Sequence, residues 1–466
     1  MSGVAGNHRS AVRRLSLIAG ATGAALALAV AAAIALAPGE AGVGDPFFPN
    51  AGNGGYDAGH YSLDLDYRPD SGKLDATATI DATATQSLSA FNLDYRGPKV
   101  RAVTVDGHPA AFARAGQELV ITPAATIAAG APFTAEIAYR GRPKPLRDPD
   151  GSIAGWIPTD DGAFVAGEPQ ASPTWFPCND HPTDKATYEF RITVPKGTEA
   201  VANGALLGRK RDGSKVIWSY AAEQPMASYL ATATIGEFRL ERKRFDGIES
   251  LVAVDPRQAR SARRPLSRIK QITRFFSTIF GPYPFGQTGA IVDWAPQVGY
   301  ALETQTRPIY SEVPSEITVA HEIAHQWFGD SVSVERWEEI WLNEGFATWA
   351  EWRWDERAGG PTTAKVFKRL ERTPANRLIL WSPPPGDPGG AGQLFAQSVY
   401  VRGAMALEAL RQRIGDDAFY ATLRAWAAEH EYGNGTIDEF IALAEGRSGA
   451  SLDALFERYL FKPGKP

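Results

Sequence analysis

The feature that most constrains this chain is the stretch from Val319 to Glu351, which contains the pattern His-Glu-x-x-His. On a helix, residues four positions apart lie one turn apart on the same face, so His321 and His325 can present two imidazoles to one metal ion. Glu322 is rotated by one residue and can reach a metal-bound water without binding the metal. The spacing therefore predicts a metal site of the hydrolase type.

A third ligand is available on a second apolar segment. Catalytic zinc takes three protein ligands and keeps one position for water. Glu344 follows an eighteen-residue connection, 326 to 343, and is the natural third ligand. We therefore expect one zinc ion per chain, held by His321, His325 and Glu344.

The alternative interpretation of the two histidines is a solvated surface pair or a packed feature of the core. Apolar residues surround the motif at Ile317, Val319, Ile323, Trp327 and Phe328. A helix that is apolar on most sides is buried, and its buried polar groups need partners. This context favours the metal site.

Composition sets broad limits on the rest of the chain. The 466 residues are 44% hydrophobic and 22% charged, which is typical of a globular protein with two or three domains. A formal net charge of -5 gives no indication of nucleic-acid binding. Cys178 is the single cysteine, so no intrachain disulfide can form and the hydrophobic core must stabilise the fold.

The N-terminus has the pattern of an export signal. Residues 1 to 14 contain three arginines and no acid, Leu15–Ala37 is an uncharged apolar run, and acidic residues follow from Glu40. A run of this length can cross a bilayer, and the charge asymmetry places the body of the protein outside the cytoplasm. We expect a signal peptide cut near Ala37 or Ala41, or an uncleaved membrane anchor through residues 15–37.

The region from Tyr56 to about Phe238 has apolar residues with a period of two, typical of half-buried antiparallel strands. Turn signals such as Asp106-Gly107 and Asp212-Gly213 separate the runs. The predicted strands include Tyr61–Tyr67, Leu74–Ala84, Val100–Val105, Leu119–Thr122, Phe133–Tyr139, Tyr188–Val194 and Val216–Tyr220.

After Phe238 the pattern becomes mainly helical. We expect a short strand at Leu251–Val254, a helix through Leu266–Ile279, the two metal-binding helices, and a Pro/Gly-rich loop at Ser382–Gly392. Further helices are predicted at Val399–Ile414, Asp416–His430, Thr436–Glu445 and Leu452–Phe461. The prediction is a multidomain α+β protein, with a signal or anchor at residues 1–45, an N-terminal antiparallel β domain at 46–240 and a mainly helical catalytic domain at 241–466.

Four sequence signatures occur in order along the chain, and through them it resembles the zinc aminopeptidases of the aminopeptidase N and leukotriene hydrolase family. The likeness runs from about Tyr56 to the C-terminus. The signatures are Gly167–Pro169 leading into Trp175–Pro182, then Gly299–Gln305, the zinc block, and Ser398–Gly403. The resemblance implies a thermolysin-like catalytic domain after the β domain.

The resemblance also implies a role for each signature. Glu303 and Glu168 would bind the free α-ammonium of a peptide, because charge-assisted hydrogen bonds fix its position. Glu322 would be the general base, and Tyr400 would donate a hydrogen bond to the oxyanion. Glu351, two turns after Glu344, is either an acceptor for the N–H of a ligand histidine or a member of a plain surface salt bridge.

The chain departs from the family pattern in two places. Leu302 and Thr304 replace the Met and Asn of the family's Gly-x-Met-Glu-Asn, which keeps the acid but changes the residues around it. Larger relatives continue into a helical-repeat domain that roofs the cleft, whereas this chain stops at Pro466, so we expect a more open cleft.

These patterns together predict a secreted or membrane-anchored zinc aminopeptidase, a hydrolase whose partners are peptides with a free N-terminus. A zinc endopeptidase with the same zinc block is an alternative that leaves Glu168 and Glu303 without a role. A second alternative is a cell-surface binding protein with an idle metal site. The intact set of His321, Glu322, His325, Glu344 and Tyr400 argues against it.

Overall fold

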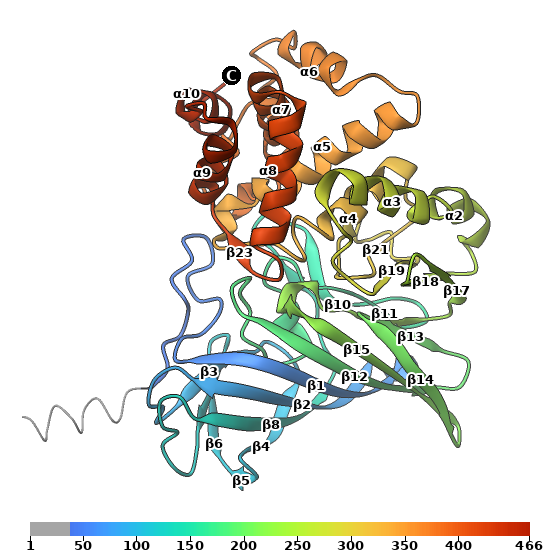
Figure 1. The fold of residues 1–466 in the computed structure, drawn as a ribbon. Coiled ribbons are helices and arrows are strands. Elements are labelled where there is room, and N and C mark those ends of the chain that lie inside the picture. The colour runs from blue at the N-terminus through green and yellow to red at the C-terminus, as the bar shows by residue number, and fades with distance from the viewer. Residues whose placement is uncertain (1–37) are drawn as a thin grey trace, which may run out of the picture.

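The computed structural model describes residues 38–466. The predicted apolar run through Leu15–Ala37 therefore lies outside the described residues. Within residues 38–466, no helix has both the length and the apolar character needed to cross a membrane. The helices gather on one side of the molecule and the large sheets on the other, as Figure 1 shows.

An eight-stranded sheet forms most of the first half. Along β1, Tyr61, Leu63 and Leu65 are buried while the residues between them are half-exposed, so the predicted period of two is present. Neighbouring strands are antiparallel except for β1 and β12, which are parallel. The strands in sheet order are β14 (Ala205–Asp212), β15 (Lys215–Ala227), β12 (Lys185–Pro195), β1 (Tyr56–Arg68), β2 (Lys73–Ala84), β8 (Pro132–Gly141), β4 (Lys99–Val105) and β5 (His108–Pro109).

Two smaller sheets complete this half. One has the order β13 (Glu199–Ala202), β16 (Ala233–Gly236), β11 (Ala163–Ala166), β10 (Ile153–Pro158) and β9 (Leu146–Arg147). The other has the order β3 (Phe91–Asp94), β7 (Glu118–Thr122) and β6 (Ala111–Ala115). All the strands predicted between Tyr56 and Phe238 are present, and β11 leads directly into Glu168.

The second half begins with a further five-stranded sheet. Its order is β17 (Arg239–Phe245), β18 (Ile248–Val254), β19 (Gln287–Val292), β21 (Ile309–Tyr310) and β20 (Ala301–Leu302). Only the strand at Leu251–Val254 is predicted from the sequence. The sequence of β17, RLERKRF, has charged residues on both faces and therefore shows no alternation. Glu303 comes directly after β20.

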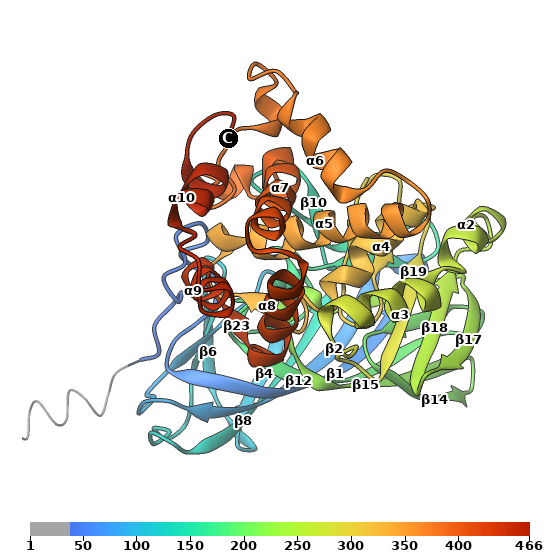
Figure 2. The same ribbon diagram turned by 45° about the horizontal axis from the view of Figure 1, so that its top comes forward.

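The predicted helices are present, except that the one expected through Leu266–Ile279 begins only at Ile269. Two helices, Ala259–Leu266 and Thr363–Glu371, were not predicted. In Figure 2, α5 lies between α4 and α7. The helices are α2 (Ala259–Leu266), α3 (Ile269–Phe280), α4 (Glu316–His325), α5 (Trp341–Arg357), α6 (Thr363–Glu371), α7 (Gln397–Ile414), α8 (Asp416–Glu429), α9 (Ile437–Ser448) and α10 (Asp453–Phe456), which runs into a π-helical turn at Glu457–Phe461. Two short strands, β22 (Ser333–Val334) and β23 (Asn434–Gly435), pair beside them.

A lysine at the start of β12 joins the two halves. The Nζ of Lys185 donates to the carbonyl oxygens of Asp330 at 3.1 Å, Ser331 at 3.0 Å and Gly433 at 2.8 Å. Burial lowers the pKa of Lys185 to about 7. These contacts fix the loop that follows α4 against the β domain, so the metal-binding helix is held in place relative to Glu168.

Candidate active site

The helix that bears the metal-binding motif is capped and buried. Ser315 precedes α4, and its Oγ accepts a hydrogen bond from the backbone N–H of Thr318 at 3.0 Å. The apolar side chains around the motif, such as Val319 and Ile323, are fully buried. This packing places the polar side chains of the helix in the interior.

The three predicted zinc ligands lie together. The Nε2 of His321 is 3.1 Å from Oε2 of Glu344, and the Nε2 of His325 is 3.4 Å from the same oxygen. The ligand atoms of the three residues lie within 4.8 Å of one another. Two imidazoles and one carboxylate at this separation fit the donor set of a catalytic zinc ion.

The other nitrogen of each imidazole faces an acceptor. The Nδ1 of His321 lies 2.7 Å from Oε1 of Glu351, and the Nδ1 of His325 lies 3.0 Å from the carbonyl oxygen of Phe328. When Nδ1 carries the hydrogen, Nε2 keeps a lone pair that can bind a metal ion. The Nε2 atoms of both rings are directed to the same point. The sequence left two roles open for Glu351, an acceptor for a ligand histidine or a surface salt bridge. The structure shows the contact with the ligand histidine His321.

A second group of carboxylates adjoins the metal cluster. Oxygens of Glu168, Glu303 and Glu344 lie within 4.8 Å of one another. The Oε1 atoms of Glu168 and Glu303 are buried and accept no hydrogen bond within residues 38–466. Gly167 is needed to place Glu168, because a Cβ there would lie 2.3 Å from Oγ of Ser172. The group is suited to a cation that the protein itself does not supply.

Electrostatics reinforces this picture. Burial raises the pKa of Glu322 to about 8, and burial together with Glu303 raises that of Glu168 well above its usual range. Glu344 is also buried, but its contacts with the ligand histidines lower its pKa to about 2. Four acids in one buried site favour a dication at the imidazoles and a second positive charge beside it.

Close contact between two helices places Tyr400. A Cβ at Gly345 on α5 would lie 3.0 Å from the carbonyl carbon of Gly403 on α7, so the two backbones touch. Tyr400 lies one turn before Gly403, and its ring centroid is 6.0 Å from that of His321 with the planes 24° apart. The phenol is therefore beside the metal cluster, as the resemblance implied.

Arg402 has a structural role that sequence analysis did not assign. Its side chain is fully buried and donates hydrogen bonds to the carbonyl oxygens of Trp381, Arg458, Tyr459, Lys462 and Gly464. These bonds tie α7 to the loop before it and to the C-terminal segment. The sequence feature that could have indicated this role is a charged residue between Val401 and Gly403 on a buried helix.

All the predicted site residues line one cavity of about 510 Å³. The residues are Glu168, Glu303, His321, Glu322, His325, Glu344 and Tyr400. Four further residues that no sequence signal indicated also line it, Asp150, Ser152, Val298 and Phe395.

Comparison with protein families agrees with this geometry. The Peptidase M1 N-terminal domain matches residues 57–230, and the Peptidase family M1 domain matches residues 301–459. The chain belongs to peptidase family M1.

Curated relatives of this M1 family chain include Aminopeptidase M1 of Arabidopsis thaliana, 29% identical over an alignment of 331 residues that covers 65% of this chain and 37% of that protein. Probable aminopeptidase 2 of Sulfurisphaera tokodaii is 25% identical over 318 residues, 63% of this chain and 40% of that protein. The chain thus spans about two fifths of the length of these relatives.

Solved structures match over nearly the whole of both chains. An M1 zinc metallopeptidase from Deinococcus radiodurans has a TM-score of 0.84 and 27% identity, covering 91% of this chain and 98% of that one. A mutant of that protein bound to a Tyr-Ser-Ala substrate has a TM-score of 0.83 with 27% identity, and the match covers 90% of this chain and 97% of that one. These matches confirm the predicted fold class, a β-rich N-terminal domain followed by a helical catalytic domain.

Proposed function

We propose that this M1 family protein is a zinc aminopeptidase that removes the N-terminal residue from peptides. The observation that supports the proposal is the pair of buried Oε1 atoms on Glu168 and Glu303, next to the metal ligand Glu344, which accept no hydrogen bond from the described residues. Carboxylates at this place bind the α-ammonium of a peptide by charge-assisted hydrogen bonds. An ammonium held there sets the first peptide bond beside the metal site and excludes internal bonds.

The chain's own side chains supply the remaining chemistry. His321, His325 and Glu344 would hold the zinc ion, which would lower the pKa of a bound water and polarise the carbonyl group of the substrate. Glu322 accepts the proton of the attacking water and passes it to the leaving amine. Tyr400 donates a hydrogen bond to the oxyanion that develops on the substrate carbonyl, and loss of such a donor costs about 2.7–4 kcal/mol of barrier.

The two other candidate functions explain fewer of the contacts. An endopeptidase uses the same metal cluster but gives no role to the Oε1 atoms of Glu168 and Glu303, which accept no hydrogen bond from the described residues. An idle binding protein has no need of a complete catalytic set. The tripeptide bound to the Deinococcus radiodurans mutant also supports a peptide substrate.

Hydrolysis of paired chromogenic dipeptides tests the proposal. One dipeptide has a free amine and the other is N-acetylated, and each is assayed with and without a chelator. We expect cleavage of the free amine alone and loss of activity with chelator. Equal cleavage of the acetylated dipeptide indicates an endopeptidase, and no cleavage of either by zinc-loaded protein indicates a binding protein.

We also propose an extracytoplasmic location, with residues 1–45 as a signal peptide or anchor. The support is the three arginines of residues 1–14, followed by the apolar run at residues 15–37. Protease added to intact spheroplasts should digest the protein if it lies outside the cytoplasmic membrane. Protection until the cells are lysed would contradict this location.

A further inference from the structure

A short part of the chain has a charge opposite to that of the whole. Residues 239–270 contain ten Lys and Arg residues and four Asp and Glu residues, a net charge of +6, whereas the chain has -5. The segment covers β17, β18 and α2 and enters α3, which lie together at one side of the catalytic domain in Figure 1. Such a concentration of positive charge attracts anionic partners and raises their concentration near this surface.

These elements enclose a groove. A cavity of about 590 Å³ lies between β17 and β18 on one side and α2 and α3 on the other. Its apolar lining includes Phe245, Val252, Val254, Leu266 and Ile269. Its cationic lining is Arg239, Lys243, Arg244, Arg263 and Lys270. No residue lines both this groove and the cavity of the metal cluster.

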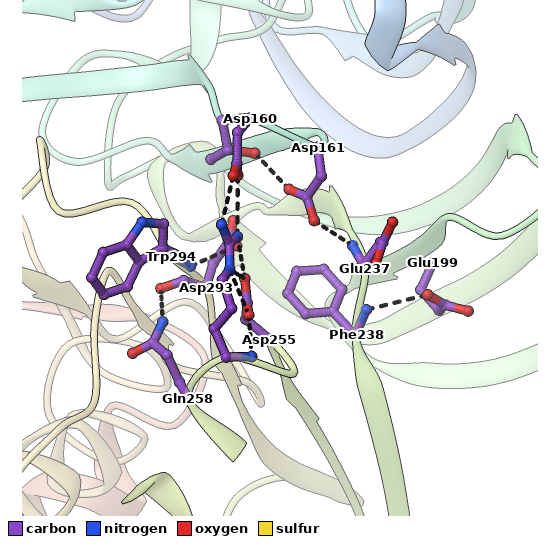
Figure 3. Close-up of polar contacts among 11 residues, drawn as sticks. Asp160, Asp161, Glu199, Glu237, Phe238, Asp255, Gln258, Asp293 and Trp294 are labelled. Atoms are coloured by element: carbon purple, nitrogen blue, oxygen red, sulfur yellow. Dashed lines mark hydrogen bonds and ion pairs between the residues drawn. The ribbon is translucent and has the colours of Figure 1, made fainter. Parts of the chain in front are cut away.

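Most of the nearby acids are already paired. Glu241 pairs with Lys243 at 2.6 Å, and Asp246 pairs with Arg274 at 2.6 Å. Asp255 and Asp160, both labelled in Figure 3, each pair with a third cation, Arg257, at 2.5 Å.

Of the five cations that line the groove, only Lys243 has such a partner among the described residues. Within residues 38–466, Arg239, Arg244, Arg263 and Lys270 form no ion pair with an acid. Four unpaired cations beside an apolar surface attract an anion more strongly than the same charges on an open surface, because the apolar side has a low dielectric constant.

Edge protection is the simplest explanation of a basic strand. β17 is the outermost strand of its sheet, and charged side chains on an edge strand prevent pairing with other chains. This explains the cations on β17 itself. It does not explain Arg263 on α2 and Lys270 on α3, which are not on the edge strand.

We propose that this groove binds an extended acidic segment of a partner protein. Within the described part of the chain, the outer edge of β17 has no partner strand, so its N–H and C=O groups can pair with an added strand. Side chains alternate along such a strand, so acidic residues can meet the cations while aliphatic residues contact Val252, Val254 and Leu266. The groove and the cavity of the metal cluster share no lining residue among those described, so the proposed occupant is a chain other than the substrate.

Fluorescence anisotropy with two labelled peptides tests the proposal on the full chain. Both peptides are N-acetylated and carry the same number of glutamates, alternating with leucine in one and with serine in the other. We expect the Glu/Leu peptide to bind at least tenfold more tightly than the Glu/Ser peptide, because only leucine fills the apolar part of the groove.

A charge-reversal variant and a matched control locate the binding. Arg239→Glu, Arg244→Glu and Arg263→Glu together should weaken binding of the Glu/Leu peptide at least thirtyfold. Three reversals on exposed residues of α6, Lys365→Glu, Lys368→Glu and Arg369→Glu, should leave it unchanged. If the triple variant does not fold, Arg244→Gln with Arg263→Gln should still weaken binding and reduce its salt dependence.

Four results would overturn the proposal. Equal binding of the two peptides, or equal loss in the α6 control, indicates non-specific attraction to a basic surface. Displacement of the Glu/Leu peptide by vesicles of phosphatidylglycerol, with tighter binding of the vesicles, indicates a membrane surface. Slower hydrolysis by the triple variant of a substrate with an acidic tail, with no change for a short substrate, indicates a substrate-binding site instead of a partner site.

Discussion

The two sides of the catalytic cavity differ in how their polar groups are satisfied. On the metal side, the Nδ1 atoms of His321 and His325 face acceptors of the chain, Glu351 and the carbonyl of Phe328. On the other side, Glu168 and Glu303 have buried carboxylate oxygens that accept no hydrogen bond within residues 38–466. The protein thus orients its metal ligands by itself, whereas the second side is completed only by a ligand.

This difference has an energetic consequence. A buried polar group without a partner costs about 1–3 kcal/mol, and more when it is charged. The contacts of the ligand histidines therefore help to hold the site together, while the free oxygens of Glu168 and Glu303 lower stability until a cation binds. We expect substitutions on the metal side to affect zinc binding, and substitutions on the other side to affect substrates with zinc retained.

The largest effect is expected for His325→Ala, which removes a metal ligand. Zinc and activity should both be lost, while the fold persists because apolar side chains already pack α4 and α5. His60→Ala on β1, far along the chain from the site, is the matched control and should retain both. Metal analysis that finds full zinc occupancy in the His325 variant would exclude His325 as a ligand.

Glu322→Gln separates the base from the ligands. The variant should retain zinc and lose about 10²–10⁴-fold in kcat, the usual contribution of a general base. Glu316→Gln, the same change on the same helix, should leave kcat unchanged. Loss of zinc from the Glu322 variant would show that this side chain binds the metal instead.

Glu303→Ala tests the side that binds the ammonium. Loss of one partner of a buried charge pair costs roughly 2–5 kcal/mol, so kcat/KM on free-amine substrates should fall on the order of a hundredfold or more. Zinc should be retained, and Glu168→Ala should have a milder effect. Acetylation of the substrate should then change little further in the Glu303 variant. If the Glu303 variant discriminates between free-amine and acetylated substrates as strongly as the wild type does, this carboxylate is not the ammonium site.

The same contrast explains what sequence can predict. His321 and His325 are one helical turn apart, so their shared direction follows from local geometry alone. Glu168 and Glu303 are 135 positions apart in the chain and follow strands of different sheets, so nothing local brings them together. Only the resemblance to known aminopeptidases assigned them a shared role.

Several features could not be predicted because they depend on packing. The strand β17 has charges on both faces, and its position at an edge explains why no alternation was needed. The contact between Gly345 and Gly403 exists only once α5 and α7 cross. Arg402 has carbonyl partners that lie up to 62 residues away. The basic groove likewise forms only when α2 and α3 pack beside β17 and β18.

The smallest effect is expected for Glu351→Ala, because this residue orients a ligand without binding the metal. Loss of such a partner typically weakens metal affinity about 10–100-fold. His321 should be affected alone, since His325 is oriented by the backbone carbonyl of Phe328, which no side-chain substitution removes. Zinc affinity is measured by competition with a chelator, with Asp355→Asn on the same helix as control. At saturating zinc, kcat should return close to that of the wild type. Unchanged zinc affinity would mean that the contact of Glu351 with His321 is a salt bridge with no part in metal binding.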